Sequence, residues 1–429
     1  MANEDMITVE LTGMAHGGAA LGRHDGKVVF VDGGLPGEVV HAAIVDDRKR
    51  YAKARVAEVV TPVSARVSQP RCPHFGDPRR RFSVDGLAEA GLFCGGCQWQ
   101  HASYTAQLRY KQAIVADQLQ RIGRVDEPVV RSTLAMDNPW HYRNNARFRL
   151  GSGGALGFVG IDGRTVADIE VCYIIHPLLM DLFEQLELDF PALKTVSLRA
   201  GINTGDQMVI LETVDDEAPA IEIDISGSCV LQLSDGPAVS LAGNTYIEEE
   251  LLGHRFRISA GSFFQVNTEM TARLVPVIRD YLDPRGYETL LDLYCGVGTL
   301  GICLADEVTE VIGVEENPVA VDDALVNAEP LDNVSLYEGA VEAVLPAIEE
   351  RVDMVILDPP RTGVEPEALK GLARLRPSRI AYVSCDPATL ARDVRRLGEA
   401  GYRLVEVRPV DLFPQTYHIE SVALLTVSD

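Results

Sequence analysis

The stretch "LLDLYCGVGTLG", Leu290 to Gly301, joins an apolar, strand-like run to a glycine-rich turn and then to a helical pattern. Gly296 and Gly298 let the backbone approach a ligand closely, and the N-terminus of the following helix favours polar or negative groups. Glu315 ends the next strand-like segment, "VIGVEEN", where a carboxylate can accept both hydroxyls of a ribose. This pattern indicates a cofactor that contains a nucleoside.

The same glycines leave two cofactors open, because positions 296, 298 and 301 also fit the fingerprint GxGxxG of dinucleotide-binding proteins. The segment "VILDPPRTG", residues 355–363, favours S-adenosylmethionine. Its Asp-Pro-Pro turn presents the carboxylate of Asp358 and stiff backbone carbonyls to a cleft, as enzymes that methylate planar groups require. A simple surface turn is the alternative interpretation.

The surrounding pattern predicts an α/β protein with three domains. From about residue 271, strand-like and helical segments alternate, which is typical of a Rossmann-like, doubly wound sheet with ligands at the carboxyl ends of its strands. The last two strand-like segments, 402–413 and 420–428, have no helix between them and predict an antiparallel hairpin at the sheet edge. We therefore place the third domain at residues 271–429.

The N-terminal part has a different periodicity. Residues 1–62 contain short alternating segments separated by glycine-rich turns, which predict a small β-barrel of the oligonucleotide-binding type. Residues 63–270 predict a central mixed α/β domain, with a helix near 104–122 and a strand-rich, antiparallel part from 140 to 265.

The composition fits a soluble globular protein of 429 residues, with 46% hydrophobic and 24% charged residues. The chain has no apolar run of about 20 residues and begins without a secretory signal, so we expect a cytoplasmic protein with no membrane partner. A net charge of −24 by itself argues against a nucleic-acid partner. Three clusters of basic residues in the first third of the chain could nevertheless contact RNA, and ordinary solvated surface is the alternative interpretation. The clusters are Arg48, Lys49, Arg50, Lys53 and Arg55; Arg79, Arg80 and Arg81; and Arg143, Arg147 and Arg149.

Cysteines occur in two settings that differ in their chemistry. Cys385, in "YVSCDPATLARD", follows a strand-like run and precedes a helix, whose dipole is expected to favour the thiolate. Cys72, Cys94, Cys97 and Cys172 form a separate group, and such a group in a cytosolic chain indicates metal or cluster ligation more than disulfides. On chemistry alone, four thiolates suit structural zinc as well as an iron–sulfur cluster.

The combination of "SCDPATLARD", "LDLYCGVGTLG", "DPPRTG", "SFFQVN" and "CPHF…CGGCQWQH" resembles the S-adenosylmethionine-dependent RNA (uracil-5-)-methyltransferase family over nearly the whole chain. The N-terminal barrel resembles the TRAM domain, an RNA-binding module of many members. The resemblance implies that Cys385 adds to C6 of uracil as the nucleophile. It also implies that Glu420, in "HIESV", is the base that removes the C5 proton, with His418 as the rival.

The resemblance carries further residues over to this chain. It implies a [4Fe-4S] cluster on Cys72, Cys94, Cys97 and Cys172, although the family has only a short loop where this chain inserts 73–93. Arg79, Arg80 and Arg81 in that insertion could extend the contact with RNA. The residues implied for the cofactor, among which Thr299 replaces a frequent asparagine, are Gln265, Tyr294, Gly296, Gly298, Thr299, Glu315 and Asp358.

We therefore expect a monomeric enzyme that makes 5-methyluridine in RNA. The TRAM-like barrel together with the four cysteines favours 23S ribosomal RNA, and transfer RNA remains the alternative because the family has both kinds of member. Methylation of an amino group and a catalytically silent, RNA-binding or redox-sensing relative are further alternatives. Trp99, Phe263 and Phe264 are candidates for stacking on bases. The alternative interpretation of each is a residue of the hydrophobic core.

Overall fold

The computed structural model describes residues 6–82, 90–151, 153–188, 190, 192–219, 222–234 and 236–428. The chain forms two compact units, each built from segments that are distant in sequence. The first unit consists of Met1–Ile114, Phe148–Tyr173 and Phe413–His418, and the second of Val115–Arg147, Ile174–Leu412 and Ile419–Asp429. None of the described helices has the length and apolarity that crossing a bilayer requires.

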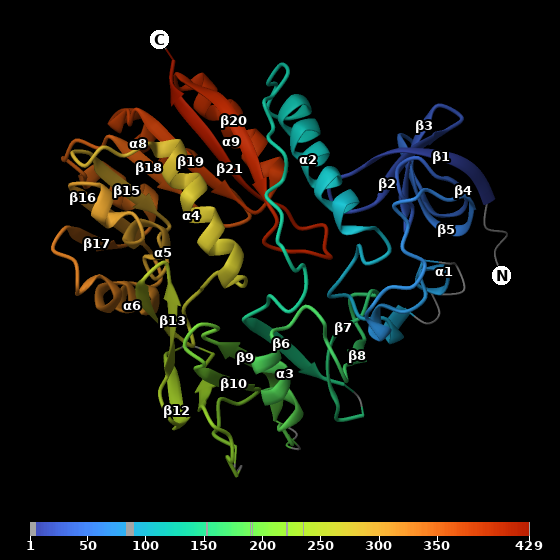
Figure 1. Ribbon diagram of the computed structural model, residues 1–429, viewed down its shortest axis with the longest axis horizontal. Helices are drawn as coiled ribbons and strands as arrows, with labels where there is room; N and C mark the ends of the chain where they lie inside the picture. The colour runs from blue at the N-terminus through green and yellow to red at the C-terminus, as the bar shows by residue number, and fades with distance from the viewer. Residues whose placement is uncertain are drawn as a thin grey trace. The chain divides into compact units, whose positions relative to one another are not determined.

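The first unit begins with a closed barrel in the strand order β1-β2-β3-β5-β4 (Figure 1). Alternate residues of β1 point inward, so that Val9 and Leu11 are buried while their neighbours face water, as a half-buried strand requires. All pairs are antiparallel except β3 with β5. The barrel strands are β1 Met6–Met14, β2 Ala20–His24, β3 Lys27–Asp32, β4 Val39–Asp47 and β5 Tyr51–Thr61. The predicted barrel is confirmed.

Short elements and loops make up the rest of the first unit. They are η1 Pro73–Phe75, α1 Pro78–Arg81, η3 Ala90–Leu92, the first part of α2 Tyr104–Arg121, the end of β6 Asn145–Leu150, β7 Leu156–Val159 and β8 Val166–Asp168. The predicted helix near 104–122 corresponds to α2. Within the insertion that follows Cys72, residues 83–89 lie outside the described part of the chain.

The second unit contains a seven-stranded sheet in the order β17-β16-β15-β18-β19-β21-β20. Strands β15 to β19 are parallel, and β21 pairs antiparallel with both β19 and β20. The strands are β15 Thr289–Leu293, β16 Glu310–Glu315, β17 Val334–Glu338, β18 Met354–Leu357, β19 Arg379–Ser384, β20 Tyr402–Val410 and β21 Glu420–Val427. The predicted Rossmann-like sheet and its antiparallel terminal hairpin are confirmed.

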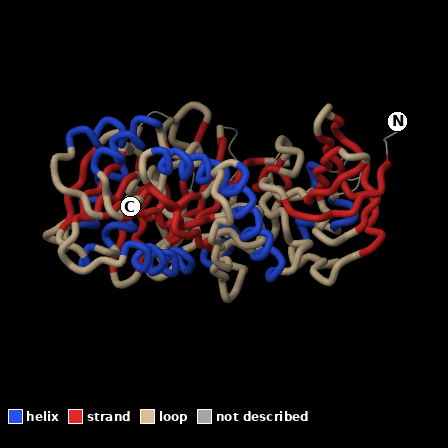
Figure 2. The backbone as a smooth tube through the Cα atoms, turned by 90° about the horizontal axis from the view of Figure 1, so that it is seen from above, coloured by secondary structure: helices blue, strands red, loops and turns tan. Residues whose placement is uncertain are grey.

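Helices flank this sheet, and in Figure 2 they lie on both sides of its strands. They are α4 Thr268–Leu282, α5 Thr299–Ile302, η4 Ala305–Glu307, α6 Pro318–Ala328, α7 Val341–Val344, η5 Leu345–Ala347, α8 Pro366–Leu375 and α9 Pro387–Glu399. The start of α9 is specified locally, because Pro387 occupies the first turn and Asp386 accepts hydrogen bonds from the backbone N–H groups of Ala388 and Thr389.

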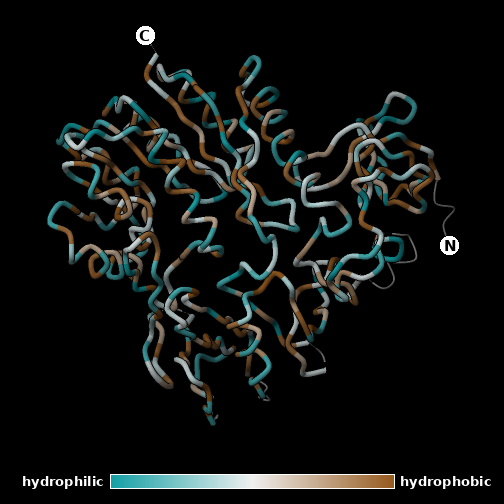
Figure 3. Tube along the Cα trace, viewed as in Figure 1, coloured by the Kyte–Doolittle hydropathy of each residue, from teal (hydrophilic) through white to brown (hydrophobic). Residues whose placement is uncertain are grey.

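The central strands of the sheet are rich in apolar residues, as Figure 3 shows by their brown segments. All four residues of β18 are buried, which is typical of a parallel strand covered by helices on both sides. Burial of these strands forces their polar residues to the strand ends. The carboxyl edge of the sheet is therefore where functional side chains can collect.

The central part of the chain supplies the remaining elements of the second unit. Strands β9 to β12 are neighbours in sequence order, with β10 and β11 parallel and the other pairs antiparallel. The elements are α3 Pro177–Glu184, β9 Leu193–Ala200, β10 Gln207–Thr213, β11 Ser228–Gln232, β12 Ala238–Ala242 and the hairpin β13 Tyr246–Leu251 with β14 His254–Ser259. The division into domains at residues 62 and 270 stays a prediction.

Candidate active site

Five of the predicted residues lie where neighbouring strands end. Glu315 is the last residue of β16, while Tyr294, Asp358 and Cys385 follow β15, β18 and β19 respectively. Glu420 reaches the same edge from the opposite direction, because β21 is antiparallel to β19 and begins with this residue. Parallel strands place their carboxyl ends at one edge, and one reversed strand adds a residue from its amino end.

The nucleophile and base candidates are adjacent in this register. Ser384, the last residue of β19, pairs with Ser421, so Cys385 and Glu420 occupy the next positions on the two strands. Cys385 is half-buried and Glu420 is buried. Within the described residues, Oε1 of Glu420 makes no hydrogen bond and is shielded from solvent. This carboxyl oxygen is free to take part in proton transfer.

The turn after β15 has the backbone geometry that its glycines permit. Gly296 and Gly298 have φ values of 56° and 83°, and a Cβ at Gly298 would lie only 2.7 Å from Cδ1 of Ile302. The N–H of Gly296 donates to Oε2 of Glu315 at 2.9 Å, and the N–H of Asn317 donates to Oε1 at 2.8 Å. These two bonds hold the carboxylate of Glu315 in place, and each of its oxygens keeps the capacity to accept a further hydrogen bond.

The other predicted cofactor residues surround this turn. Tyr294 has a positive φ of 62°, which directs the backbone out of β15 into the turn. Thr299 is buried at the first position of α5, so its side chain is part of the wall of the turn. Gln265 donates from Nε2 to Oδ2 of Asp358 at 3.4 Å, and its backbone carbonyl accepts from Nδ2 of Asn144 at 2.9 Å. Gln265 and Asp358 are thereby brought together from distant segments.

The electrostatics of Cys385 differ from the expectation for a helix N-terminus. Burial, followed by the nearby Glu420 and Asp358 carboxylates, raises the pKa of the Cys385 thiol to about 12. The helix dipole is worth at most about 2 kcal/mol in favourable geometry, which does not offset these effects here. The surroundings of Cys385 therefore favour the thiol, although its position at a helix N-terminus favours the thiolate.

The two carboxyl groups beside Cys385 affect one another. Burial raises the pKa of Asp358 to about 7, and burial together with Asp358 raises the pKa of Glu420 well above its usual range. Two carboxylates so close in a site with little water cannot both ionise easily. The exposed guanidinium of Arg361 opposes this effect and lowers the pKa of both Glu420 and Cys385.

Two residues of this edge were missed by the sequence analysis as site residues. Asp292, within β15, accepts from the N–H of Gly301 at 2.9 Å and so holds the start of α5 against the strand. Its signal was an acidic residue inside the apolar run "LLDLY". Arg361, whose charge acts on Cys385 and Glu420, was signalled only by its place in "DPPRTG".

The other candidates separate into buried and exposed groups. Trp99 is buried and donates from Nε1 to the carbonyl of Gly18, and Phe264 is also buried. Both are therefore core residues, as the alternative interpretation predicted. Phe263 is 64% exposed and remains available for stacking. The ring of His418 packs against Phe413 and Tyr417.

The four cysteines of the predicted metal site all lie in the first unit, and they are buried and form no disulfide. Burial and the charges of Cys172, Cys94 and Cys72 raise the pKa of the Cys97 thiol, which shows that the four sulfurs share one electrostatic environment. The N–H of Gly96 points at Sγ of Cys94, 3.3 Å away. No set of three His, Cys, Asp or Glu side chains in the described ranges is arranged to hold a metal ion.

A buried arginine lies beside these thiols. Arg81 is 1% exposed, so the expectation that it extends a basic surface is wrong. Its Nη1 and Nη2 donate to the carbonyls of Phe75 and Cys97 at 3.0 Å and 2.9 Å. Burial lowers the pKa of Arg81 to about 10, and the charges that favour its protonated form are those of Cys94, Cys97 and Cys72. A buried cation is stabilised by a nearby buried anion, which thiolates at these cysteines would supply.

Comparisons with known proteins agree with this architecture. Residues 241–428 match the family model described as tRNA (Uracil-5-)-methyltransferase, and residues 5–57 match the TRAM domain. An uncharacterized RNA methyltransferase of Halalkalibacterium halodurans is 36% identical, with 99% of this chain and 98% of the relative covered. Another from Thermosynechococcus vestitus is 35% identical, with 98% of both chains covered.

A solved structure has a similar fold over the whole chain. The tRNA (uracil-54, C5)-methyltransferase of Pyrococcus abyssi, in complex with S-adenosyl-L-homocysteine, has a TM-score of 0.74 and 25% identity, and 98% of this chain and 100% of that chain are covered. The fold and the TRAM barrel define a Rossmann-like RNA methyltransferase. This chain belongs to the RNA (uracil-5-)-methyltransferase family.

Proposed function

We propose that this protein transfers a methyl group from S-adenosylmethionine to C5 of a uridine in RNA, with Cys385 as the covalent nucleophile. The observation that carries the proposal is the pairing of β19 with β21, which places Cys385 beside Glu420 and near Asp358. A methyltransferase that acts on an amino nitrogen has no need of a thiol at this position. The family relationship and the intact set of residues also argue against a silent relative.

The residues of this edge can perform the reaction in three steps. Sγ of Cys385 bonds to C6 of uracil as its thiol proton leaves, which makes C5 nucleophilic. C5 then takes the methyl group, and S-adenosylhomocysteine is the leaving product. Glu420 removes the proton from C5, and the electron pair of that bond expels Cys385. One proton is released for each 5-methyluridine that forms.

The methyl donor is proposed to lie at the carboxyl edge of β15, β16 and β18. Glu315 would accept hydrogen bonds from the ribose hydroxyls, and Gly296 and Gly298 would allow the backbone to approach. The remaining contacts are assigned to Gln265, Tyr294, Thr299 and Asp358. The S-adenosyl-L-homocysteine in the similar Pyrococcus abyssi structure supports this placement.

We also propose a [4Fe-4S] cluster on Cys72, Cys94, Cys97 and Cys172. The buried guanidinium of Arg81 supports it, because a cluster with four thiolates is an anion that would balance this charge. Four thiolates suit structural zinc equally well on chemistry alone, and the resemblance to the family favours the cluster. The cluster would tie three separate loops together.

For the RNA, the TRAM domain together with the four cysteines favours 23S ribosomal RNA. The similar Pyrococcus abyssi structure is that of a tRNA methyltransferase, which favours transfer RNA, the alternative substrate. The three predicted parts would divide the work, with residues 1–62 and 63–270 gripping RNA and 271–429 performing the chemistry. The target uridine must leave its stack to reach Cys385.

The test uses purified protein, labelled S-adenosylmethionine and unmodified transcripts of 23S ribosomal RNA and transfer RNA. We expect 5-methyluridine at one position of one RNA, and none with Cys385→Ala, which should still bind RNA. Label in both RNAs would assign a broader substrate range. A Cys385→Ala protein that still methylates C5 would contradict the mechanism.

A further inference from the structure

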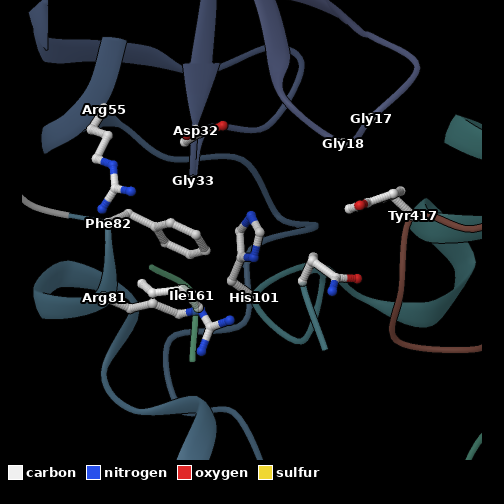
Figure 4. Close-up of a pocket in the computed structure, with 11 residues that line it drawn as sticks. Gly17, Gly18, Asp32, Gly33, Arg55, Arg81, Phe82, His101, Ile161 and Tyr417 are labelled. Carbon is white, nitrogen blue, oxygen red and sulfur yellow. The ribbon is translucent and has the colours of Figure 1, made fainter. Parts of the chain in front are cut away.

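A cavity that is separate from the active-site edge lies entirely within the first unit (Figure 4). Its volume is about 170 Å³, which is enough for one flat heterocycle. Residues of the TRAM barrel form one part of its wall, and residues around the cysteine group form another. The residues that carry the argument are Asp32, Arg55, Arg81, Phe82, Gln98 and Tyr417.

The wall of this cavity contains buried polar atoms whose partners are missing from the described residues. Arg81 uses both terminal nitrogens for backbone carbonyls, which leaves its Nε without an acceptor. Gln98 donates from Nε2 to the carbonyl of Gly95 at 2.7 Å, which leaves Oε1 without a donor. Nη1 of Arg55 also lacks an acceptor. The residues that line the cavity thus leave two donors and one acceptor without a partner in the described part of the chain, and both ring nitrogens of His101 also have none.

Aromatic rings complete the wall. The centroids of Phe82 and His101 are 4.8 Å apart, and Figure 4 shows Tyr417 across the cavity from them. Glycines allow these rings to come close to the barrel, because a Cβ at Gly33 would lie 2.3 Å from Cγ of Phe82. Flat faces beside unused hydrogen-bonding groups are the features with which proteins bind unstacked bases of single-stranded RNA.

The mixture of donors and acceptors decides which part of RNA fits. A phosphate group offers only acceptors and would meet the Asp32 carboxyl and Oε1 of Gln98 unfavourably. A nucleobase offers acceptors for Arg55 and Arg81 and donors for Gln98 and Asp32 on one planar edge. We propose that this cavity binds one unstacked nucleobase of the RNA substrate, at a position other than the uridine that is methylated. The inference rests on the proposed RNA function and adds a second point of recognition.

The test compares two probes of equal length and charge. One is a fluorescent, single-stranded RNA of about 20 nucleotides with mixed sequence, and the other carries a stable abasic sugar at every position. We expect the full-length protein to bind the RNA probe about tenfold more tightly or better, because stacking is worth about 1–3 kcal/mol per base. Arg55→Lys keeps the charge but loses the planar fork, so it should reduce this ratio severalfold.

Gln98→Leu should reduce the ratio in the same way, whereas the matched change Lys27→Arg, on the barrel but outside the cavity, should not. Unchanged affinity for the abasic probe shows that each variant is folded. An unchanged ratio in both cavity variants would overturn the inference. An equal decrease in affinity for both probes, which share the sugar–phosphate backbone, would overturn it in favour of a phosphate site.

The proposed reaction is tested separately by 5-methyluridine formation with each variant. A wild-type protein that discriminates the probes as expected but methylates no RNA would overturn the reaction and support the cavity. A wild-type protein that methylates RNA while the cavity variants leave the ratio unchanged would overturn the cavity alone.

Discussion

The carboxyl edge of the C-terminal sheet and the cysteine group of the first unit both bury thiols, but they surround them with opposite charges. Beside Cys385 lie the carboxyls of Glu420 and Asp358, which raise the pKa of the thiol further. Burial raises the pKa of Cys72 and Cys94 as well, but the guanidinium of Arg81 beside them partly opposes this effect. Similar side chains therefore stand in different electrostatic surroundings.

The charges beside a buried cysteine affect which chemical role its thiol can perform. A buried guanidinium would stabilise sulfur anions, which suits the proposed ligands of a metal cluster. Neighbouring carboxyls keep the thiol protonated until a reaction step removes the proton, which suits a nucleophile that must also leave. Substitutions at the two sites should therefore have different consequences.

The largest effect is expected at the base. Glu420→Gln keeps the shape of the side chain but cannot take the C5 proton, so turnover should fall by about 10³-fold. The enzyme should stall as a methylated protein–RNA adduct that survives denaturing electrophoresis and carries label from S-adenosylmethionine. His418→Gln is the matched comparison and should turn over without such an adduct. The reverse pattern would assign the base to His418.

The pH dependence of adduct formation should follow the carboxyl-rich surroundings of Cys385. With a thiol pKa of about 12, the thiolate fraction rises about tenfold for each pH unit through the neutral range, and Asp358 ionises near pH 7. The rate should therefore rise from pH 6 to pH 9 rather than fall. Single-turnover rates at saturating S-adenosylmethionine measure this, with circular dichroism as the control for folding. A flat profile would show that Cys385 is ionised at neutral pH.

In the cysteine group of the first unit, Arg81→Met should weaken binding of the proposed iron–sulfur cluster. Removal of the buried charge that balances the thiolates should speed the loss of iron to a chelator by about tenfold. Iron content and visible absorbance after anaerobic preparation measure this without reference to activity. Arg79→Met, on the same short helix but exposed and paired with Asp77, is the control. Stoichiometric zinc and no iron in the wild-type protein would contradict the cluster.

The smallest effect is expected on the barrel surface. Arg48, Lys49 and Arg50 are exposed and follow β4, where they can reach phosphates. Replacing all three by glutamine should lower the salt dependence of RNA binding by about 0.7 in slope for each phosphate that is no longer neutralised. Arg351→Gln, on an exposed loop of the second unit, should leave the slope unchanged. An unchanged slope in the triple variant would place the phosphate-binding residues elsewhere.

The sequence by itself determined the order of the elements and the residues at the strand ends. Apolar runs, glycine turns and cap residues such as Asp386 act over a few neighbouring residues, so "LLDLYCGVGTLG" and "YVSCDPATLARD" predicted their strands, turns and helices correctly. The barrel and the final hairpin were predictable for the same reason. The motifs also identified Cys385 and Glu420 as candidates before their positions were known.

Only the tertiary structure decided the surroundings of these residues. The reversal of β21 brings Glu420 to Cys385, and burial then reverses the expected effect of the helix dipole on the thiol. In the first unit, folding buries Arg81, which looked like a surface residue in a basic run, and leaves unused polar atoms around a cavity. Burial and charge depend on groups that are distant in sequence, and local patterns contain no information about which of these groups will meet.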